Sequence, residues 1–326
     1  MAVVVIQGNQ VTGAGKTSLA AALLVTANAA GKQAGYYKPF SDELGADPDV
    51  EFISHLLQNS SGGPSVPAPK PLASLTDSES MAEVQAEVSR LESEAGIVII
   101  EGPDAAGNTG GAYAPNCRSV LVHRYSNLTG ASAVAAQINA SVGMAAIVVN
   151  HAPIHRRDAV VRDLSKHSMP VAVIPESRGM LSVSVEQLAE HLGGQWVLDP
   201  VNVDAPVERF MIGGNIMDSG PTYFGRHANQ AVITRVERPD IQMACMGENT
   251  KCLVLTGPGE PTEYIKAEAL NREVPLIQVR SNTLDTAESL AGLLDKADAR
   301  TAGKANHFAG LLQTYMGAEA VAQLLS

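Results

Sequence analysis

The sequence has few aromatic residues and few cysteines, and basic residues are outnumbered by acidic ones. Aromatic residues make up only 4% of the 326 residues, while small and aliphatic residues abound, which is typical of parallel sheets packed closely by helices. The formal net charge is −11. Because nucleic acids and anionic membranes gain nothing from a negative field, we expect neither as a partner. A local basic pocket for phosphate is compatible with this charge.

The three cysteines, Cys117, Cys245 and Cys252, are odd in number and widely spaced. This spacing excludes a disulfide framework and a CxxC metal site, so we expect reduced thiols in a cytoplasmic protein. No apolar run approaches the roughly 18 residues that span a bilayer. The stretch from Met1 to Ile6 is too short for a signal peptide. We therefore expect no membrane segment.

The length suits two α/β domains, and the first half alternates short apolar runs with amphipathic stretches. This alternation predicts βαβ crossovers and a doubly wound, mostly parallel sheet. The runs expected to be strands are rich in Val and Ile: Ala2 to Ile6, Ala34 to Lys38, Ile97 to Ile100, Ser119 to His123, Ala145 to Val149 and Val171 to Ile174. The expected helices are Lys16 to Ala30, Ser80 to Ser93, Ala131 to Val142, Arg157 to His167 and Val185 to His191.

The second half predicts a smaller α/β unit of its own. Asn59 to Thr76 is irregular and reads as a surface loop, whereas Leu198 to Pro206 reads as the interdomain linker. We therefore expect domains over residues 1–200 and 206–326, the second ending in a helical tail from about Lys304 to Leu325. Its expected strands are Ala231 to Thr234, Cys252 to Leu255 and Leu276 to Val279, and its helices Ile241 to Gly247, Pro261 to Asn271 and Thr283 to Leu294.

The most informative segment is VVVIQGNQVTGAGKTSLAAALL, from Val3 to Leu24. A buried strand runs into a glycine-containing turn that opens onto an apolar helix near Lys16, so backbone N–H groups and the helix N-terminus converge on one point. Lys16 would reach the β- and γ-phosphates, and the Thr17 hydroxyl would coordinate Mg²⁺. Gln10 replaces the first glycine of the strict pattern, so the loop is a variant P-loop; the alternative is a chance GKT in an ordinary turn. We expect Mg·ATP to be bound by Gly13, Ala14, Gly15, Lys16, Thr17 and Ser18.

Further polar residues fall at strand ends, where an open parallel sheet places its ligand site. Lys38 precedes a proline at the tip of the second strand, where it could neutralise phosphate charge. Asp47 and Asp49 stand just before an amphipathic segment, Val50 to Leu57. Glu101 follows the strand IVII, where a carboxylate can bind Mg²⁺ directly or through water.

The segments GNQVTGAGKT, YYKPF, DPDVEFI, IIEGPDAAG and VVNHAP recur in order, and together they resemble the dethiobiotin-synthetase-like P-loop ATPases. Within that group the sequence is most similar to the N-terminal region of long phosphotransacetylases and their stand-alone relatives. From about Val207 to Leu290 it resembles the DRTGG domain that follows this ATPase, mainly through AVITRVERPDIQMACM, with LVLTGPGEP behind it.

The resemblance implies a role for each matching residue. Lys16 and Thr17 would serve phosphate and metal, Asp49 and Glu101 would be acidic metal ligands, and Lys38 would be the phosphate-side lysine. Asn150 falls where relatives contact the nucleotide base. Each has an alternative: Asp49 could cap the following helix, and Asn150 could be a turn residue.

The sequence also departs from these families. It ends about where the acyltransferase domain of a phosphotransacetylase would begin, so we do not expect acetyl transfer to coenzyme A. In the second domain, Arg235 to Pro239 stands where the family has a glycine-containing turn, so no ligand is carried over to that domain.

Three functions are compatible with these patterns. The first is a nucleotide-responsive regulatory or ATPase module, whose second domain senses a small molecule or mediates assembly. The second is an ATP-dependent ligase that activates a carboxylate or carbamate, with Lys16 and Lys38 as catalytic residues. The third is an assembly scaffold that binds no nucleotide. The relatives imply a homo-oligomer.

Overall fold

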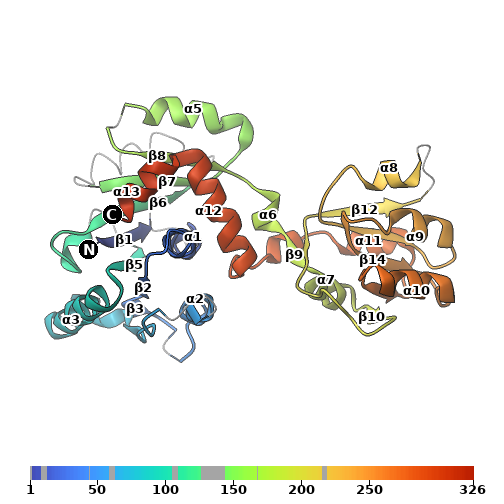
Figure 1. Cartoon of the computed structure of the whole chain (residues 1–326), viewed down its shortest axis with the longest axis horizontal. Coiled ribbons are helices and arrows are strands. Elements are labelled where there is room, and N and C mark those ends of the chain that lie inside the picture. The colour runs from blue at the N-terminus through green and yellow to red at the C-terminus, as the bar shows by residue number, and fades with distance from the viewer. Residues whose placement is uncertain are drawn as a thin grey trace. The chain divides into compact units, whose positions relative to one another are not determined.

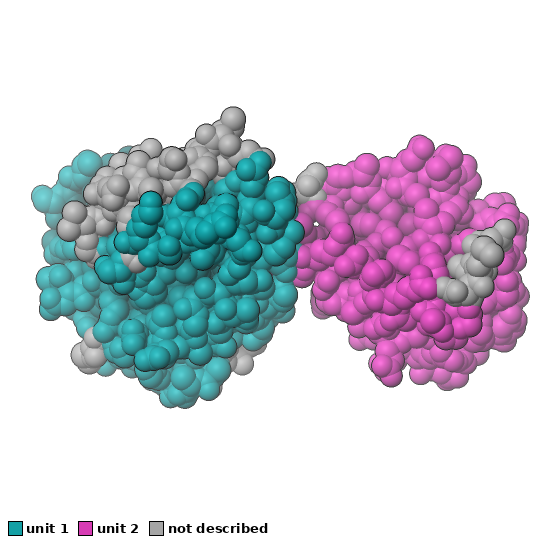
Figure 2. Space-filling view, turned by 90° about the horizontal axis from the view of Figure 1, so that it is seen from above, with its two compact units in different colours: residues 1–177, 299–326 teal, residues 178–298 magenta. Residues whose placement is uncertain are grey.

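The computed structural model describes residues 2–8, 13–43, 45–58, 63–104, 109–125, 144–166, 168–214 and 219–326. Part of the predicted phosphate loop, with Gln10, and the predicted helix Ala131 to Val142 lie outside these residues, as does His167. The chain forms two compact units, Met1–Ser177 with Ala299–Ser326 and Arg178–Asp298 (Figure 2). None of the helices in the described ranges is long and apolar enough to cross a membrane.

The first unit is built on a six-stranded sheet in the order β2-β5-β1-β6-β7-β8, with every pair parallel (Figure 1). From β1, inside the sheet, the chain crosses to the edge strand β2 and returns to β5 between them. It then continues on the other side of β1 through β6, β7 and β8, which makes the sheet doubly wound. The strands are β1 (Ala2–Gly8), β2 (Ala34–Tyr37), β5 (Ile97–Asp104), β6 (Arg118–Arg124), β7 (Met144–Ala152) and β8 (Val171–Pro175).

Helices cover the faces of this sheet because successive strand residues point to opposite sides. Val3 and Val5 pack with α3 (Ser78–Ala95), and Ile147 and Val149 of β7 pack with α5 (Ile154–Leu164). The sheet also contacts α1 (Lys16–Ala29) and α12 (Ala302–Met316). Two further helices of this unit are α2 (Pro48–Gln58) and α13 (Ala318–Leu324).

The expected surface loop from Asn59 to Thr76 is more regular at its end than the sequence indicates. β4 (Lys70–Pro71) pairs in parallel with β3 (Phe40–Ser41), and a short 3₁₀ helix, Leu72–Thr76, follows it directly. A second 3₁₀ helix, Gly110–Ala112, lies later in the chain, after β5. A two-residue strand carries too short a pattern to be predicted from sequence.

The second unit is a five-stranded sheet in the order β10-β15-β14-β13-β12, parallel except for β10. Its strands are β10 (Gln195–Trp196), β12 (Arg209–Gly213), β13 (Gln230–Arg235), β14 (Thr250–Thr256) and β15 (Leu276–Val279). A separate ladder joins β9 (Val183–Ser184) to β11 (Pro206–Val207). The helices are α6 (Arg178–Leu181), α7 (Val185–Leu192), α8 (Gly220–Phe224), α9 (Pro239–Cys245), α10 (Glu263–Asn271), α11 (Thr283–Ser289) and the 3₁₀ helix Leu294–Lys296.

The fold class is therefore the expected one, but the division between the units differs from the expected residues 1–200 and 206–326. The expected linker, Leu198 to Pro206, lies inside the second unit, because strands on both sides of it pair there: β10 with β15 and β11 with β9. The C-terminal tail belongs to the first unit, where α12 packs along α1 and β8. Near the chain end, Lys32 Nζ donates to the Leu325 carbonyl at 2.9 Å.

Candidate functional site

The phosphate loop leads into α1 at the carboxyl end of β1. Gly13 and Gly15 have φ angles of 77° and 99°, in the left-handed region that glycine adopts without strain. Gly15 is the N-cap of α1 and has no side chain that could cap it, and the first turn carries no acidic residue. The N-terminus of a helix that starts in this way is where backbone amides and the helix dipole favour an anion, as a P-loop requires.

Asn150, near the end of β7, is hydrogen-bonded to the described part of this loop. Its Nδ2 donates to the Ala14 carbonyl at 3.2 Å, and its Oδ1 accepts from the His151 amide at 2.9 Å. A Cβ on Gly15 would collide with the same Nδ2. These bonds do not test the predicted contact between Asn150 and the nucleotide base. They show that Asn150 binds the backbone of the loop at Ala14, a role that sequence analysis did not foresee.

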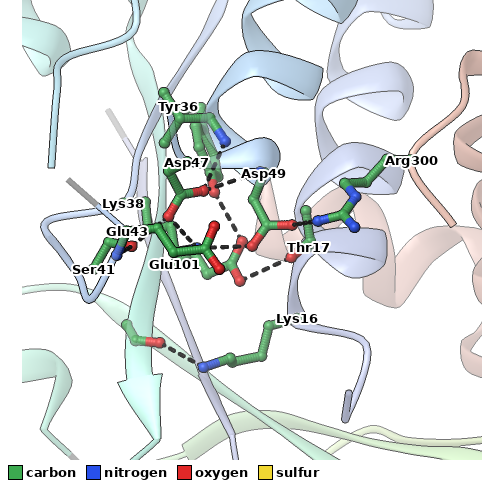
Figure 3. Close-up of polar contacts among 12 residues, drawn as sticks. Lys16, Thr17, Tyr36, Lys38, Ser41, Glu43, Asp47, Asp49, Glu101 and Arg300 are labelled. Atoms are coloured by element: carbon green, nitrogen blue, oxygen red, sulfur yellow. Dashed lines mark hydrogen bonds and ion pairs between the residues drawn. The ribbon is translucent and has the colours of Figure 1, made fainter. Parts of the chain in front are cut away.

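Thr17 contacts Glu101 directly, and Lys16 reaches the backbone just after Glu101 (Figure 3). Thr17 Oγ1 donates to Glu101 Oε1 at 2.9 Å, and Lys16 Nζ donates to the Gly102 carbonyl at 3.1 Å. Tyr36 donates its hydroxyl proton to the other oxygen, Glu101 Oε2, at 2.8 Å. The carboxylate of Glu101, only 3% exposed, is therefore held between α1 and β2.

Burial raises the pKa of Glu101, and the nearby charge of Asp49 raises it further, against the opposing effects of Lys16, Lys38 and Tyr36. Burial also raises the pKa of Tyr36 well above its usual range, so it stays a hydrogen-bond donor. A divalent cation beside the Thr17 hydroxyl would offset the cost of ionising Glu101. The donor set, a hydroxyl and a carboxylate oxygen at a phosphate loop, suits Mg²⁺.

A second group of charges surrounds Lys38. Its Nζ lies 2.7 Å from both Asp47 Oδ2 and Asp49 Oδ2. Burial opposes the charged form of Lys38, but the hydrogen bonds to the two carboxylates outweigh it and raise its pKa. Burial likewise opposes ionisation of Asp47, and bonds from Lys38 and Ser41 outweigh it to lower that pKa. The predicted phosphate-side lysine is thus neutralised by two carboxylates.

The alternative reading of Asp49 as a helix cap is wrong, because Asp47 performs that task. Asp47 Oδ1 accepts from the amides of Asp49 at 2.9 Å and Val50 at 3.1 Å, at the start of α2. The Asp49 carboxylate is left for Lys38 and for Arg300, whose Nη1 lies 3.3 Å from Asp49 Oδ1. The described residues hold no group of three or more His, Cys, Asp or Glu arranged around a metal position.

Sequence analysis missed Tyr36, Arg300 and Arg124. Tyr36 lies two residues before Lys38, and the period of a strand puts both on one side, so this signal was present. Arg124 ends β6, and its Nη1 is 3.1 Å from where a Cβ on Gly13 would lie. Arg300 lies 251 positions beyond Asp49, and no local pattern connects them.

Two family models match the chain. Residues 6–116 match an AAA domain, and residues 187–293 match the DRTGG domain. The first match contains the phosphate loop with Lys38, Asp49 and Glu101; the second lies within the second compact unit. The resemblance drawn from the sequence, a dethiobiotin-synthetase-like P-loop domain followed by a DRTGG domain, is confirmed.

Several solved structures are similar to parts of the chain. The CBS and DRTGG domains of Clostridium perfringens pyrophosphatase, complexed with diadenosine tetraphosphate, share 14% identity over 45% of this chain and 76% of that one, with a TM-score of 0.31. Cobyrinic acid a,c-diamide synthase from Mycobacterium smegmatis, with bound ADP and magnesium, shares 16% sequence identity with this chain. The match covers 55% of this chain and 88% of that one, with a TM-score of 0.38. The signal recognition particle receptor FtsY from Elizabethkingia anophelis, in complex with GDP, shares 18% sequence identity. The match covers 52% of this chain and 56% of that one, with a TM-score of 0.37.

Proposed function

We propose that this chain, which joins a dethiobiotin-synthetase-like P-loop domain to a DRTGG domain, binds Mg·ATP and acts as a nucleotide-responsive regulatory or ATPase module. The observation that carries the proposal is the hydrogen bond from Thr17 to the buried Glu101, next to the N-terminus of α1, whose N-cap is Gly15. A hydroxyl paired with a carboxylate at this point is what a Mg²⁺-triphosphate site needs.

Each predicted residue has a role in this proposal. The amides from Gly13 to Ser18 and the ammonium of Lys16 would bind phosphate oxygens, and Thr17, Glu101 and Asp49 would hold Mg²⁺. When bound, the ion neutralises phosphate charge. Lys38 balances Asp47 and Asp49 in this structure. A phosphoryl oxygen is an alternative partner for its ammonium, and Asn150 would keep the loop in place.

We expect Lys16→Ala to abolish the thermal stabilisation by Mg·ATP and to leave the melting temperature without nucleotide nearly unchanged. Ligand at 100 times its Kd stabilises a protein by about 2.7 kcal/mol, so the loss is measurable by differential scanning fluorimetry. Lys166→Ala removes an exposed lysine elsewhere in the same unit and should keep the full shift. If Lys16→Ala melts as the parent does with Mg·ATP, the loop is not the nucleotide site.

The runner-up function is an ATP-dependent ligase that activates a carboxylate or carbamate. Its support is the pair of cations, Lys38 and Arg300, on either side of Asp49, since both could orient an anionic substrate. Phosphate release with and without carboxylates, diamines and bicarbonate separates the two functions. Turnover that rises strongly with one compound favours the ligase, and slow turnover indifferent to all favours the module.

We also propose a cytoplasmic homo-oligomer that takes an unidentified small-molecule effector. Reduced thiols and ATP both belong to the cytoplasm, and Cys245 and Cys252 are buried and unpaired. The homo-oligomer is carried over from the resemblance, since relatives of both domains assemble.

A further inference from the structure

A pocket of about 1020 Å³ lies in the second unit, at the carboxyl ends of β14 and β15. One wall is the loop after β14, from Gly257 to Pro261, and another is the turn from α7 into β10. Ligands of open α/β sheets bind at this edge, outside the carboxyl ends of the strands. The volume is ample for a small molecule.

Gln278 of β15 lines this pocket and holds an acceptor without a partner. Its Nε2 donates to the Gly257 carbonyl at 2.8 Å, which fixes the orientation of the amide. Its Oε1 is buried and accepts no hydrogen bond from any residue that the structure describes. A buried acceptor of this kind favours a ligand that brings an N–H or O–H group.

Trp196, the sole tryptophan of the chain, lines the same pocket from β10. It is partly buried, packs at the edge of the apolar cluster beneath it, and stands one residue from the strand partner of Gln278. An indole in a ligand pocket provides a flat apolar surface on which an aromatic ring stacks. The ligand favoured by Trp196 and Gln278 together is a flat ring that carries an N–H group.

The charges at the pocket favour a single anionic group. Lys266 is engaged by Glu260 at 3.3 Å and Glu263 at 3.0 Å, so its charge is already balanced. Arg280, exposed at the end of β15, forms no ion pair with any described residue. One guanidinium without a carboxylate partner suits a ligand with one phosphate group. A triphosphate carries more negative charge than Arg280 balances, and Glu260 in the pocket lining would repel it.

We infer that this pocket binds a nucleoside monophosphate, with its base against Trp196, a base N–H on Gln278 Oε1 and its phosphate toward Arg280. The site belongs to the DRTGG domain and does not depend on the ATP site of the first unit. It assigns the second domain a ligand class, which the ATP-binding proposal leaves open.

Trp196 makes the test direct, since it is the sole tryptophan of the chain and lines this pocket. The full-length chain is titrated with AMP and with GMP in the absence of Mg²⁺, with excitation at a wavelength that the nucleotides do not absorb. We expect a saturable change in Trp196 emission, kept in Lys16→Ala, and about tenfold weaker binding in Gln278→Leu and in Arg280→Ala. Adenosine and inorganic phosphate alone should each bind more weakly than AMP.

Lys251→Ala is the matched control, because it removes a cation from a different pocket of the same unit and should bind as the parent does. Thermal melting of Gln278→Leu checks its fold, and Arg280→Ala changes only an exposed side chain. An emission that neither nucleotide changes up to millimolar concentration would overturn the inference, and so would equal binding by the parent and both pocket variants. Loss of binding in Lys16→Ala alone would assign the signal to the ATP site instead.

Discussion

At the scale of single residues, the charges around Lys38 show how far sequence reasoning reaches. The rule that ligand sites lie at the carboxyl edge of a parallel sheet predicted that Lys38, Asp49 and Glu101 would come together, and the structure brings them together. Which aspartate caps α2 was beyond that rule, since Asp47 and Asp49 are equally good cap residues. Hydrogen bonds to specific amides decided in favour of Asp47.

Gly15→Ala tests the geometry of the phosphate loop at one atom. An alanine Cβ would collide with Asn150 Nδ2 and occupy a φ of 99°, so we expect the Mg·ATP thermal shift to be lost. Gly31→Ala is the control: its φ of 70° carries similar strain, about 1–2 kcal/mol, but a Cβ there meets no atom within 4 Å. Retention of the shift in both variants would refute the role assigned to the Asn150 contact.

At the scale of elements, α12 was correctly predicted as a helix but assigned to the wrong unit. Its amphipathic pattern shows that one face is buried, and any apolar surface would satisfy that pattern. In the structure that surface is formed by α1 and β8, and both lie more than a hundred residues before α12 in the chain. The helix that begins at the phosphate loop is therefore packed by the end of the chain.

Phe308→Ala measures this packing. Phe308 lies on α12 and is 1% exposed, and truncating a buried phenylalanine costs about 3–5 kcal/mol of folding free energy. The urea concentration at the midpoint of unfolding of the first unit should therefore be lower in this variant. Gln313→Ala on the exposed side of the helix should change stability by less than about 0.5 kcal/mol. Equal midpoints for the two variants would mean that α12 contributes little to the first unit.

At the scale of the whole molecule, the chain leaves the first unit after Ser177 and returns at Ala299. The second unit has apolar clusters of its own on both sides of its sheet, one with α7 and another with α9 and α10. A unit with its own core can fold alone. The first unit is discontinuous and needs both segments of the chain.

We therefore expect a fragment of residues 178–298 to unfold cooperatively, with its own melting transition by circular dichroism. Residues 1–177 alone lack α12 and should show no cooperative transition, or one at a much lower temperature. A stable 1–177 fragment, together with an unfolded 178–298 fragment, would contradict the division described above.

The sequence by itself determined the two α/β units, the mostly parallel sheet of the first, most of the longer strands and helices, and the phosphate-loop motif with Lys16 and Thr17. These features are written in local patterns: the period of burial, glycines in a turn, and a strand that leads into a helix. Only the tertiary structure decided that Arg300 reaches Asp49, that Asn150 binds the loop, that the tail covers α1, and that Trp196 and Gln278 share a pocket. Those contacts join residues far apart in the chain, and they form only when packing brings whole elements together, so no local pattern encodes them.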